Sequence, residues 1–207
     1  MTGYDTKIKL CGLSRPCDIE AANACRPDYI GFVFAPDSRR YVTPEQAARL
    51  KELLAPGILA VGVFVREDPA QIADLLQAGI IHMTQLHGSE DEAYIRRLRA
   101  LTDRPILQAF RIRTSQDLAA AQASTADGVL LDSGAGGGTL LDWNLARHMK
   151  RPYYLAGGLT PENVARAVET LHPYGVDVSS GIETKGHKDS RKMEAFVSAL
   201  RSQSFLR

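Results

Sequence analysis

The sequence DYIGFVFAPDSRRYVTPEQAARLKELL, residues 28–54, contains the structural unit from which the fold can be read. Its first part, residues 28–34, is a run of apolar and aromatic residues that predicts a buried β-strand. A polar turn follows. Thr43, Pro44 and Gln46 then form a helix start, with an N-cap hydroxyl, a proline in the first turn and a capping box. The unit is a strand, a loop and a helix.

The same unit recurs along the rest of the chain. A short apolar or β-branched run precedes a helical pattern at residues 7–11, 59–65, 80–88, 105–112, 128–132, 153–158 and 175–181. Eight strands that alternate with helices predict a parallel sheet, and they suggest a single-domain α/β fold of the (β/α)8 TIM barrel type. A doubly wound open sheet has the same alternation and stays the alternative. No linker rich in Pro, Gly or Ser divides the chain, so we expect one domain over residues 1–207.

Two further helix starts carry recognisable caps. Ser89 and Glu92 have the spacing of a capping box before an apolar periodic segment. Thr160 is followed directly by Pro161, which suits an N-cap and the first helical position. We therefore expect helices to begin at these two points.

The composition excludes several classes of protein. The 207 residues are 44% hydrophobic with a net charge of +1, and the basic residues are spread along the chain. Such a balance does not favour nucleic acid or a membrane surface as a partner. No apolar run approaches the ~18 residues of a membrane span, so we expect a cytoplasmic protein.

The three cysteines fit neither a disulfide framework nor a zinc site. Cys11, Cys17 and Cys25 are odd in number and lack the close pairs that zinc sites use. Cys17 and Cys25 lie eight residues apart in a predicted helix, and we expect them to share a buried face. Cys11 differs from both because it ends a predicted strand.

Polar residues gather where the predicted strands end. In a parallel barrel, the active site forms at the carboxyl ends of the strands. The residues found at or just after such ends include Cys11, Arg39, Arg40, His87 and Asp132. These side chains are therefore expected to lie around one mouth.

The last two strand ends indicate phosphate binding. Gly157 and Gly158 allow the backbone to approach an anion, and Ser179, Ser180 and Gly181 offer the same on the next strand. The loops after the seventh and eighth strands are the common phosphate site of this fold. Each Gly-Gly alone is more often a turn, whereas the two together favour a phosphate site.

Cys11 and Asp132 would face each other across the mouth as a base and an acid. A thiol can serve as a base where the site favours its thiolate, and a carboxylic acid can donate a proton. Taken alone, Cys11 is more often a small side chain at a strand end, and Asp132 is more often a solvated loop residue or a cap. Asp177 lies inside a strand, where a charge needs a partner or a ligand. No metal or cofactor fingerprint is visible; His82 and His87 lack the spacing of a helical metal pair.

Assembled in order, these motifs resemble the phosphoribosylanthranilate isomerase family of tryptophan biosynthesis. The resemblance runs from Lys7 to Phe196 and rests on KLCGL, DYIGFVFAPDSRRYV, VGVFV, QLHG, LLDS, a glycine-rich loop before DW, LAGGLTPENV and VDVSSGIE. It implies a single barrel that rearranges a phosphosugar–anthranilate substrate, an aminoaldose, to an aminoketose without a cofactor. The oligomeric state is left open between a monomer and a homodimer.

The resemblance also implies roles for individual residues. Asp132 matches the general acid that opens the sugar ring, and Cys11 matches the general base that takes the proton from C2. Arg40 matches the arginine near the anthranilate carboxylate. His87 and Asp177 match pocket-lining positions that contact substrate, and the phosphate site matches Gly157, Gly158, Ser179, Ser180 and Gly181.

The loop after residues 128–132 departs from the family pattern. Gly137 stands where family members commonly have threonine, and Leu141 stands where they have phenylalanine. We expect this glycine-rich loop to be mobile and to close over a ligand.

Two other functions remain possible at this stage. A histidine-pathway or dual-substrate isomerase would be expected to carry aspartate where this chain has Cys11. A non-catalytic phospholigand-binding barrel could lack either proton-transfer group.

Overall fold

The strands form a closed barrel. The computed structural model describes residues 6–133 and 142–201. Eight parallel strands follow one another in chain order, and the last pairs with the first, which closes the sheet. The strands are β1 (Lys7–Cys11), β2 (Tyr29–Val33), β3 (Leu59–Phe64), β4 (Met83–Leu86), β5 (Ile106–Arg111), β6 (Gly128–Asp132), β7 (Tyr153–Leu155) and β8 (Gly175–Val178). The predicted (β/α)8 barrel is confirmed, and the open sheet is excluded.

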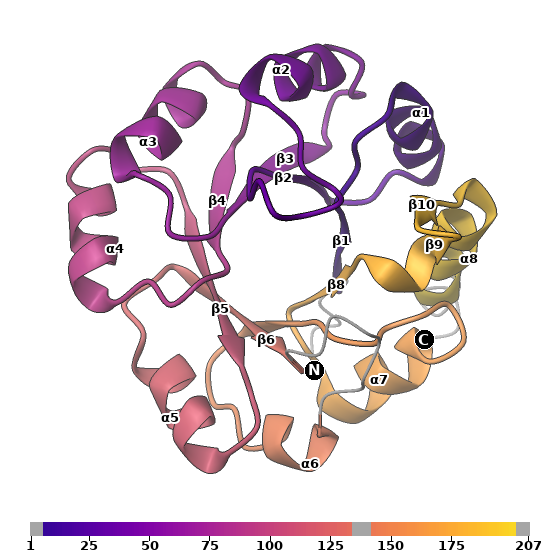
Figure 1. Cartoon of the computed structure of the whole chain (residues 1–207). Helices are drawn as coiled ribbons and strands as arrows, with labels where there is room; N and C mark the ends of the chain where they lie inside the picture. The colour runs from indigo at the N-terminus through magenta and orange to yellow at the C-terminus, as the bar shows by residue number, and fades with distance from the viewer. Residues whose placement is uncertain (1–5, 134–141, 202–207) are drawn as a thin grey trace.

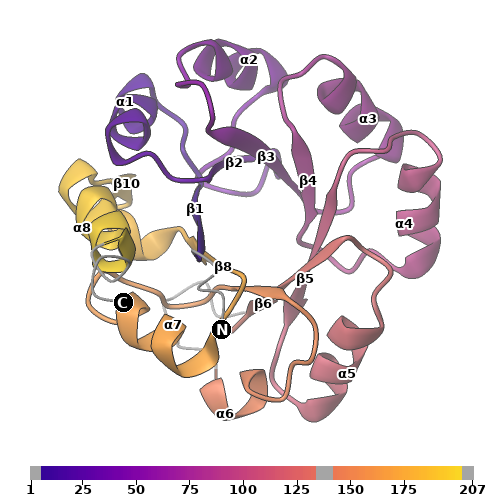
Figure 2. The ribbon, with the colours of Figure 1, turned by 180° about the vertical axis from the view of Figure 1, so that it is seen from behind.

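The helices surround this barrel as a ring, which Figures 1 and 2 show from its two ends. They are α1 (Pro16–Cys25), α2 (Pro44–Glu52), α3 (Pro69–Gln77), α4 (Glu92–Arg99), α5 (Ser115–Ala123), α6 (Trp143–Ala146), α7 (Val164–Leu171) and α8 (Ser190–Arg201). Between β8 and α8 the chain forms a short 3-10 helix, η1 (Ser180–Ile182), and a hairpin of β9 (Glu183–Thr184) and β10 (His187–Lys188). This insertion carries charged residues to the site described below.

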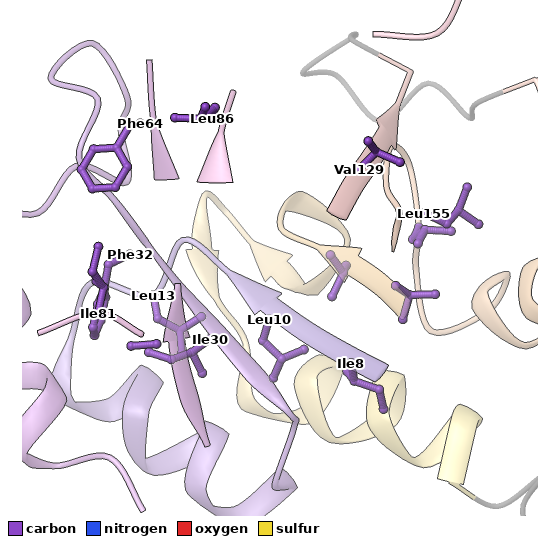
Figure 3. Packing of buried hydrophobic residues seen from close by; sticks show 14 of the residues in the cluster. Ile8, Leu10, Leu13, Ile30, Phe32, Phe64, Ile81, Leu86, Val129 and Leu155 are labelled. Atoms are coloured by element: carbon purple, nitrogen blue, oxygen red, sulfur yellow. The ribbon is translucent and has the colours of Figure 1, made fainter. Parts of the chain in front are cut away.

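The main hydrophobic core lies between the strands and the helices. Side chains alternate along a strand, so Ile8 and Leu10 point outward from β1 and are fully buried against the helical layer. Phe32, Phe64 and Ile81 lie close to one another in the same core (Figure 3). This core fixes each helix to its strand and thereby fixes where each βα-loop begins.

The barrel interior is filled in layers. Leu107, Leu130, Tyr154 and Ala156 form a buried apolar cluster inside the barrel. A second small cluster contains Cys11, which lies at the carboxyl end of β1. The interior is therefore packed below and opens into polar residues above, as this fold requires of a site at the carboxyl ends of its strands.

Two helix starts differ from the sequence prediction. Helix α4 is capped by Asp91, whose side chain accepts a hydrogen bond from Tyr94, so the predicted Ser89 cap is wrong. Helix α7 begins at Val164 rather than next to Thr160. There the Asn163 side chain accepts the N–H of Thr160 and closes a turn that delays the helix. In contrast, the predicted capping box of Thr43 and Gln46 is confirmed.

The expected burial of the two helical cysteines is also wrong. Cys17 is exposed, and Cys25 is only half-buried. The inward face of α1 is formed instead by Asp18, Ile19 and Ala22. Asp18 takes the inward position because its carboxylate accepts backbone N–H groups at the start of the helix.

None of the described helices is both long and apolar enough to cross a membrane. The prediction of a single domain over residues 1–207 extends beyond the described ranges and stays a prediction. The substituted loop positions Gly137 and Leu141, and with them the expected closure of this loop, also lie outside the described residues.

Candidate active site

A cavity of about 280 Å³ opens at the carboxyl ends of the strands. Every residue to which the resemblance gave a role lines it: Cys11, Arg40, His87, Asp132, Gly157, Gly158, Asp177, Ser179, Ser180 and Gly181. Arg39, which was also expected at the mouth, is not among the lining residues. A separate hollow beside α3 and α4 contains none of them. The fold thus brings together side chains and loops from β1, β2, β4, β6, β7 and β8.

Cys11 lies in an apolar part of the cavity wall and is 7% exposed, beside Val33 and Val63. Burial raises the pKa of its thiol, and a buried cation opposes that rise. The next residue, Gly12, has a φ of +79°, and a Cβ there would lie 2.3 Å from Cδ of Arg40. The Cys-Gly pair therefore ends the strand on a thiol and leaves room for an arginine to cross beside it.

Asp132 ends β6 and lies close to His87, with 3.4 Å between Oδ2 and Nε2. The amide nitrogen of Gln85 lies 2.9 Å from Nδ1 of the same imidazole. This contact orients the imidazole relative to the Asp132 carboxyl. Gln85 and Asp132 therefore contact opposite nitrogens of the same ring.

Arg40 is held by a carboxylate from the hairpin after β8. Its Nε and Nη2 atoms lie 2.6 Å and 3.0 Å from the two oxygens of Glu183. Burial acts to raise the pKa of Glu183, but Arg40 and Lys188 outweigh it and hold the pKa below its usual value. The bidentate pair fixes the guanidinium plane and leaves further N–H groups to bind an anion.

The cations around Glu183 outnumber it. Arg39 reaches Oε2 at 2.5 Å, and the buried Lys188 reaches Oε1 at 2.7 Å. Lys188 also donates to the backbone oxygen of Ser179 at 2.9 Å. Arg39, Arg40 and Lys188 are thus three cations against one carboxylate. This excess gives that side of the cavity a positive potential that attracts anions.

The two loops predicted to hold phosphate lie against each other. A Cβ placed on Gly181 would lie 1.8 Å from the carbonyl oxygen of Leu159, so only glycine permits this approach. No described residue accepts a hydrogen bond from the N–H groups of Gly158, Ser180 or Gly181. Because α7 begins at Val164, an anion at these loops would meet the loop amides rather than a helix start at Thr160.

The sequence prediction missed four residues around this cavity: Lys9, Gln85, Glu183 and Lys188. Gln85 was recognisable as a polar residue within a buried strand, the same signal that identified Asp177. Lys9 was not, because the alternation in its strand is also typical of a strand with one face in water. Glu183 and Lys188 gave no local signal, because their partners lie far along the chain or in a hairpin that was not predicted. Among the described residues, no three His, Cys, Asp or Glu side chains are grouped as a metal site.

A closed (β/α)8 barrel with a polar cavity at the carboxyl ends of its strands defines the class of (β/α)8-barrel enzymes. The family model described as N-(5'-phosphoribosyl)anthranilate (PRA) isomerase matches residues 8–199. This chain belongs to that family.

Individual relatives agree with this assignment. The N-(5'-phosphoribosyl)anthranilate isomerase of Lacticaseibacillus casei (strain BL23) is 46% identical over 190 residues, which cover 92% of each chain. The crystal structure of phosphoribosyl anthranilate isomerase from Thermotoga maritima has a TM-score of 0.87 at 33% identity, covering 95% of this chain and 99% of that one. A phosphoribosyl anthranilate isomerase structure with a TM-score of 0.84, 33% identity and the same coverage holds reduced 1-(o-carboxyphenylamino)-1-deoxyribulose 5-phosphate.

Proposed function

We propose that this protein catalyses the Amadori rearrangement of N-(5-phosphoribosyl)anthranilate to 1-(2-carboxyphenylamino)-1-deoxyribulose 5-phosphate in tryptophan biosynthesis. The observation that carries the proposal is that Cys11 and Asp132 line the same cavity as the glycine loops after β7 and β8. An acid, a base and an anion site in one cavity are what the isomerisation of a phosphorylated sugar requires.

Asp132 acts first, as the general acid. Its protonated carboxyl gives a proton to the ring oxygen of the ribose while the bond from that oxygen to C1 breaks. The anthranilate nitrogen supplies the electron pair that makes the C1=N bond of a protonated Schiff base. The imidazole of His87 lies beside the carboxylate that remains, with Nε2 3.4 Å from Oδ2.

Cys11 acts second, as the general base. Its thiolate takes the proton from C2, and the electron pair of that bond forms C1=C2 while the C1=N electrons return to nitrogen. The product of this step is an enolamine. Loss of the proton on the C2 hydroxyl and gain of a proton at C1 give the ketone, so atoms and charges balance.

The remaining residues bind the two ends of the substrate. Arg40, fixed by Glu183, pairs with the anthranilate carboxylate through its remaining N–H groups. The backbone amides of Gly158, Ser180 and Gly181 bind the phosphate, with Gly157 and Ser179 completing the two loops. Asp177 and His87 line the wall between these ends.

The alternatives receive less support. A histidine-pathway isomerase is expected to have an aspartate at the position of Cys11. A non-catalytic barrel would not need both Cys11 and Asp132 at the mouth of one cavity. We also propose a cytoplasmic location, which the biosynthetic family supports. Size-exclusion chromatography with light scattering will distinguish the monomer from the homodimer.

The decisive experiment is a turnover assay with freshly made phosphoribosylanthranilate. We expect the purified protein to abolish the fluorescence of this substrate without any added metal or cofactor. The same rate is expected in the presence of a chelator. If the substrate is not consumed, the proposed reaction is wrong; if the chelator stops turnover and a divalent ion restores it, the cofactor-free mechanism is wrong.

A further inference from the structure

A lysine lies inside the barrel directly below the proposed base. Lys9 is 1% exposed and precedes Cys11 by two residues, so both side chains leave β1 on the inward face. An isolated ammonium group in such a place costs several kcal/mol of desolvation. The interior of this barrel therefore contains a charge that needs an explanation.

Asp177 of β8 is the ion-pair partner of this lysine. The register of the sheet places the two residues opposite each other, and Nζ of Lys9 lies 2.9 Å from Oδ1 of Asp177. Asp177 is itself 8% exposed. Buried pairs of this kind are commonly no more stabilising than apolar side chains of the same size, so stability alone does not account for the pair.

Cys11 and Lys9 meet in a space that a glycine provides. Gly31 of β2 lies opposite Cys11 in the sheet. A Cβ at Gly31 would lie 2.7 Å from Sγ of Cys11 and 3.2 Å from Nζ of Lys9. Any larger residue would occupy the point at which the ammonium and the thiol converge.

The ammonium opposes the effect of burial on the thiol. Burial raises the pKa of Cys11, and the charge of Lys9 is the largest influence that lowers it. Asp177 acts in the same direction as burial, while Lys188 of β10 assists Lys9. Burial would lower the pKa of Lys9, but Asp177 and Cys11 outweigh it and raise the pKa, so the lysine stays charged.

Arg40, His87 and Asp132 line the same cavity as the thiol, but apolar side chains pack against it directly. The cluster in which Cys11 is buried consists of Val33, Val63 and Ala35. In these apolar surroundings, a single adjacent ammonium acts with little screening.

We propose that Lys9 is a positioning residue of this enzyme: its ammonium, anchored by Asp177, stabilises the thiolate that Cys11 must form to act as a base. The inference rests on the proposed function in taking Cys11 as the base. Lys9 keeps its proton throughout, and the proton that moves passes from C2 of the sugar to Sγ. Gly31 supplies the space in which the two groups meet.

The test measures the thiol without substrate. In a Cys17→Ser/Cys25→Ala background, Cys11 is the sole thiol, and its rate of alkylation by iodoacetamide against pH reports its ionisation. Lys9→Met is expected to move this profile to higher pH by at least about one unit, which lowers the alkylation rate at neutral pH about tenfold. The pH profile of kcat/KM should move in the same direction.

Two further variants keep the result interpretable. Lys9→Met/Asp177→Asn removes both charges and leaves no buried carboxylate unpaired, so it can be measured if the single variant does not fold. The profile should still move to higher pH, because Lys9 affects the thiol more than Asp177 does. Lys7→Met is the matched control, because Lys7 leaves the same face of β1 but pairs with Asp28 at the other end of the strand. It should move neither profile.

An unchanged alkylation profile in a folded Lys9→Met variant would overturn the proposal and leave Lys9 a structural residue. An equal shift in Lys7→Met would overturn it as well, since the effect would then not depend on proximity. The failure of the proposed function looks different: either the wild-type protein does not consume phosphoribosylanthranilate or Cys11→Ser retains full turnover. Neither result depends on the alkylation profile of Cys11.

Discussion

Replacing Gly181 with alanine should separate the two loops that form the proposed phosphate site. The new Cβ would lie 1.8 Å from the carbonyl oxygen of Leu159, and the loops must move apart by about 1.6 Å before this contact reaches the ordinary 3.4 Å. The Cβ is fixed to the backbone of residue 181, and the oxygen belongs to the backbone of Leu159. No side-chain rotation can therefore relieve the contact. The change therefore acts on the distance between the β7 and β8 loops.

The size of the effect follows from the hydrogen bonds that a phosphate would lose. A hydrogen bond to a charged group contributes about 1.5–3 kcal/mol. If the displaced loops retain the donor of Gly158 but lose those of Ser180 and Gly181, the loss is about 3–6 kcal/mol. At about 1.4 kcal/mol per factor of ten, KM should rise by about 10²–10⁴-fold.

Steady-state kinetics and inhibition by inorganic phosphate together test this reasoning. Gly181→Ala should raise KM for phosphoribosylanthranilate and the inhibition constant of phosphate together. Gly57→Ala is the control: Gly57 has a φ of +91° in the loop before β3, and nothing lies within 4 Å of its built Cβ. That variant should lose about 1–2 kcal/mol of stability without any change in KM. A folded Gly181→Ala protein whose KM stays within about threefold of the wild type would refute the assignment of the phosphate site.

Three further predictions concern the proton-transfer groups and Arg40. Cys11→Ser and Asp132→Asn should each lower kcat by about 10²–10⁴-fold while inhibition by inorganic phosphate stays unchanged. Kinetic measurements with phosphoribosylanthranilate, with and without phosphate, check both values. In the wild type, kcat/KM should increase as the pH rises above neutral, because burial raises the pKa of Cys11 and the thiolate fraction grows only in that range; a buffer series measures this. Glu183→Gln should raise KM by about tenfold through loss of the bidentate anchor of Arg40, and an unchanged KM would show that the arginine needs no anchor.

The sequence predicted the fold well because each unit carries local signals. The strands at residues 7–11 and 128–132 have the bounds that the pattern indicated. Where the prediction failed, a neighbouring polar side chain took the backbone N–H groups or the inward position. Asn163 holds the N–H of Thr160 in a turn, and Asp18 rather than Cys17 occupies the inward face of its helix. Such competition depends on side-chain geometry and leaves no trace in periodicity.

The residues of the cavity were predicted less completely than the fold. Closing the sheet into a barrel changes which face of each strand is exposed, and alternation along the strand does not show this. Alternation in KIKLC is typical of a strand with one face in water, which hides the burial of Lys9. In a closed barrel the inner face of each strand is enclosed. The polar residues of the alternating pattern therefore point into the barrel, toward the site. The contact between Arg40 and Glu183 joins residues 143 positions apart, so no local pattern could indicate it.

The proposed site must keep a carboxyl protonated while a thiol is ionised, which reverses the usual order of their pKa values. A carboxyl normally loses its proton at a lower pH than a thiol does, yet the proposed mechanism needs a protonated Asp132 and an ionised Cys11 together. The two groups have different neighbouring residues. Lys9 brings a fixed positive charge to the thiol, which favours the thiolate. Asp132 instead lies beside the imidazole of His87, whose other ring nitrogen contacts Gln85. Lys9 and Gln85 each precede a predicted site residue by two positions on the same strand face, and they contact the surroundings of the base and of the acid respectively.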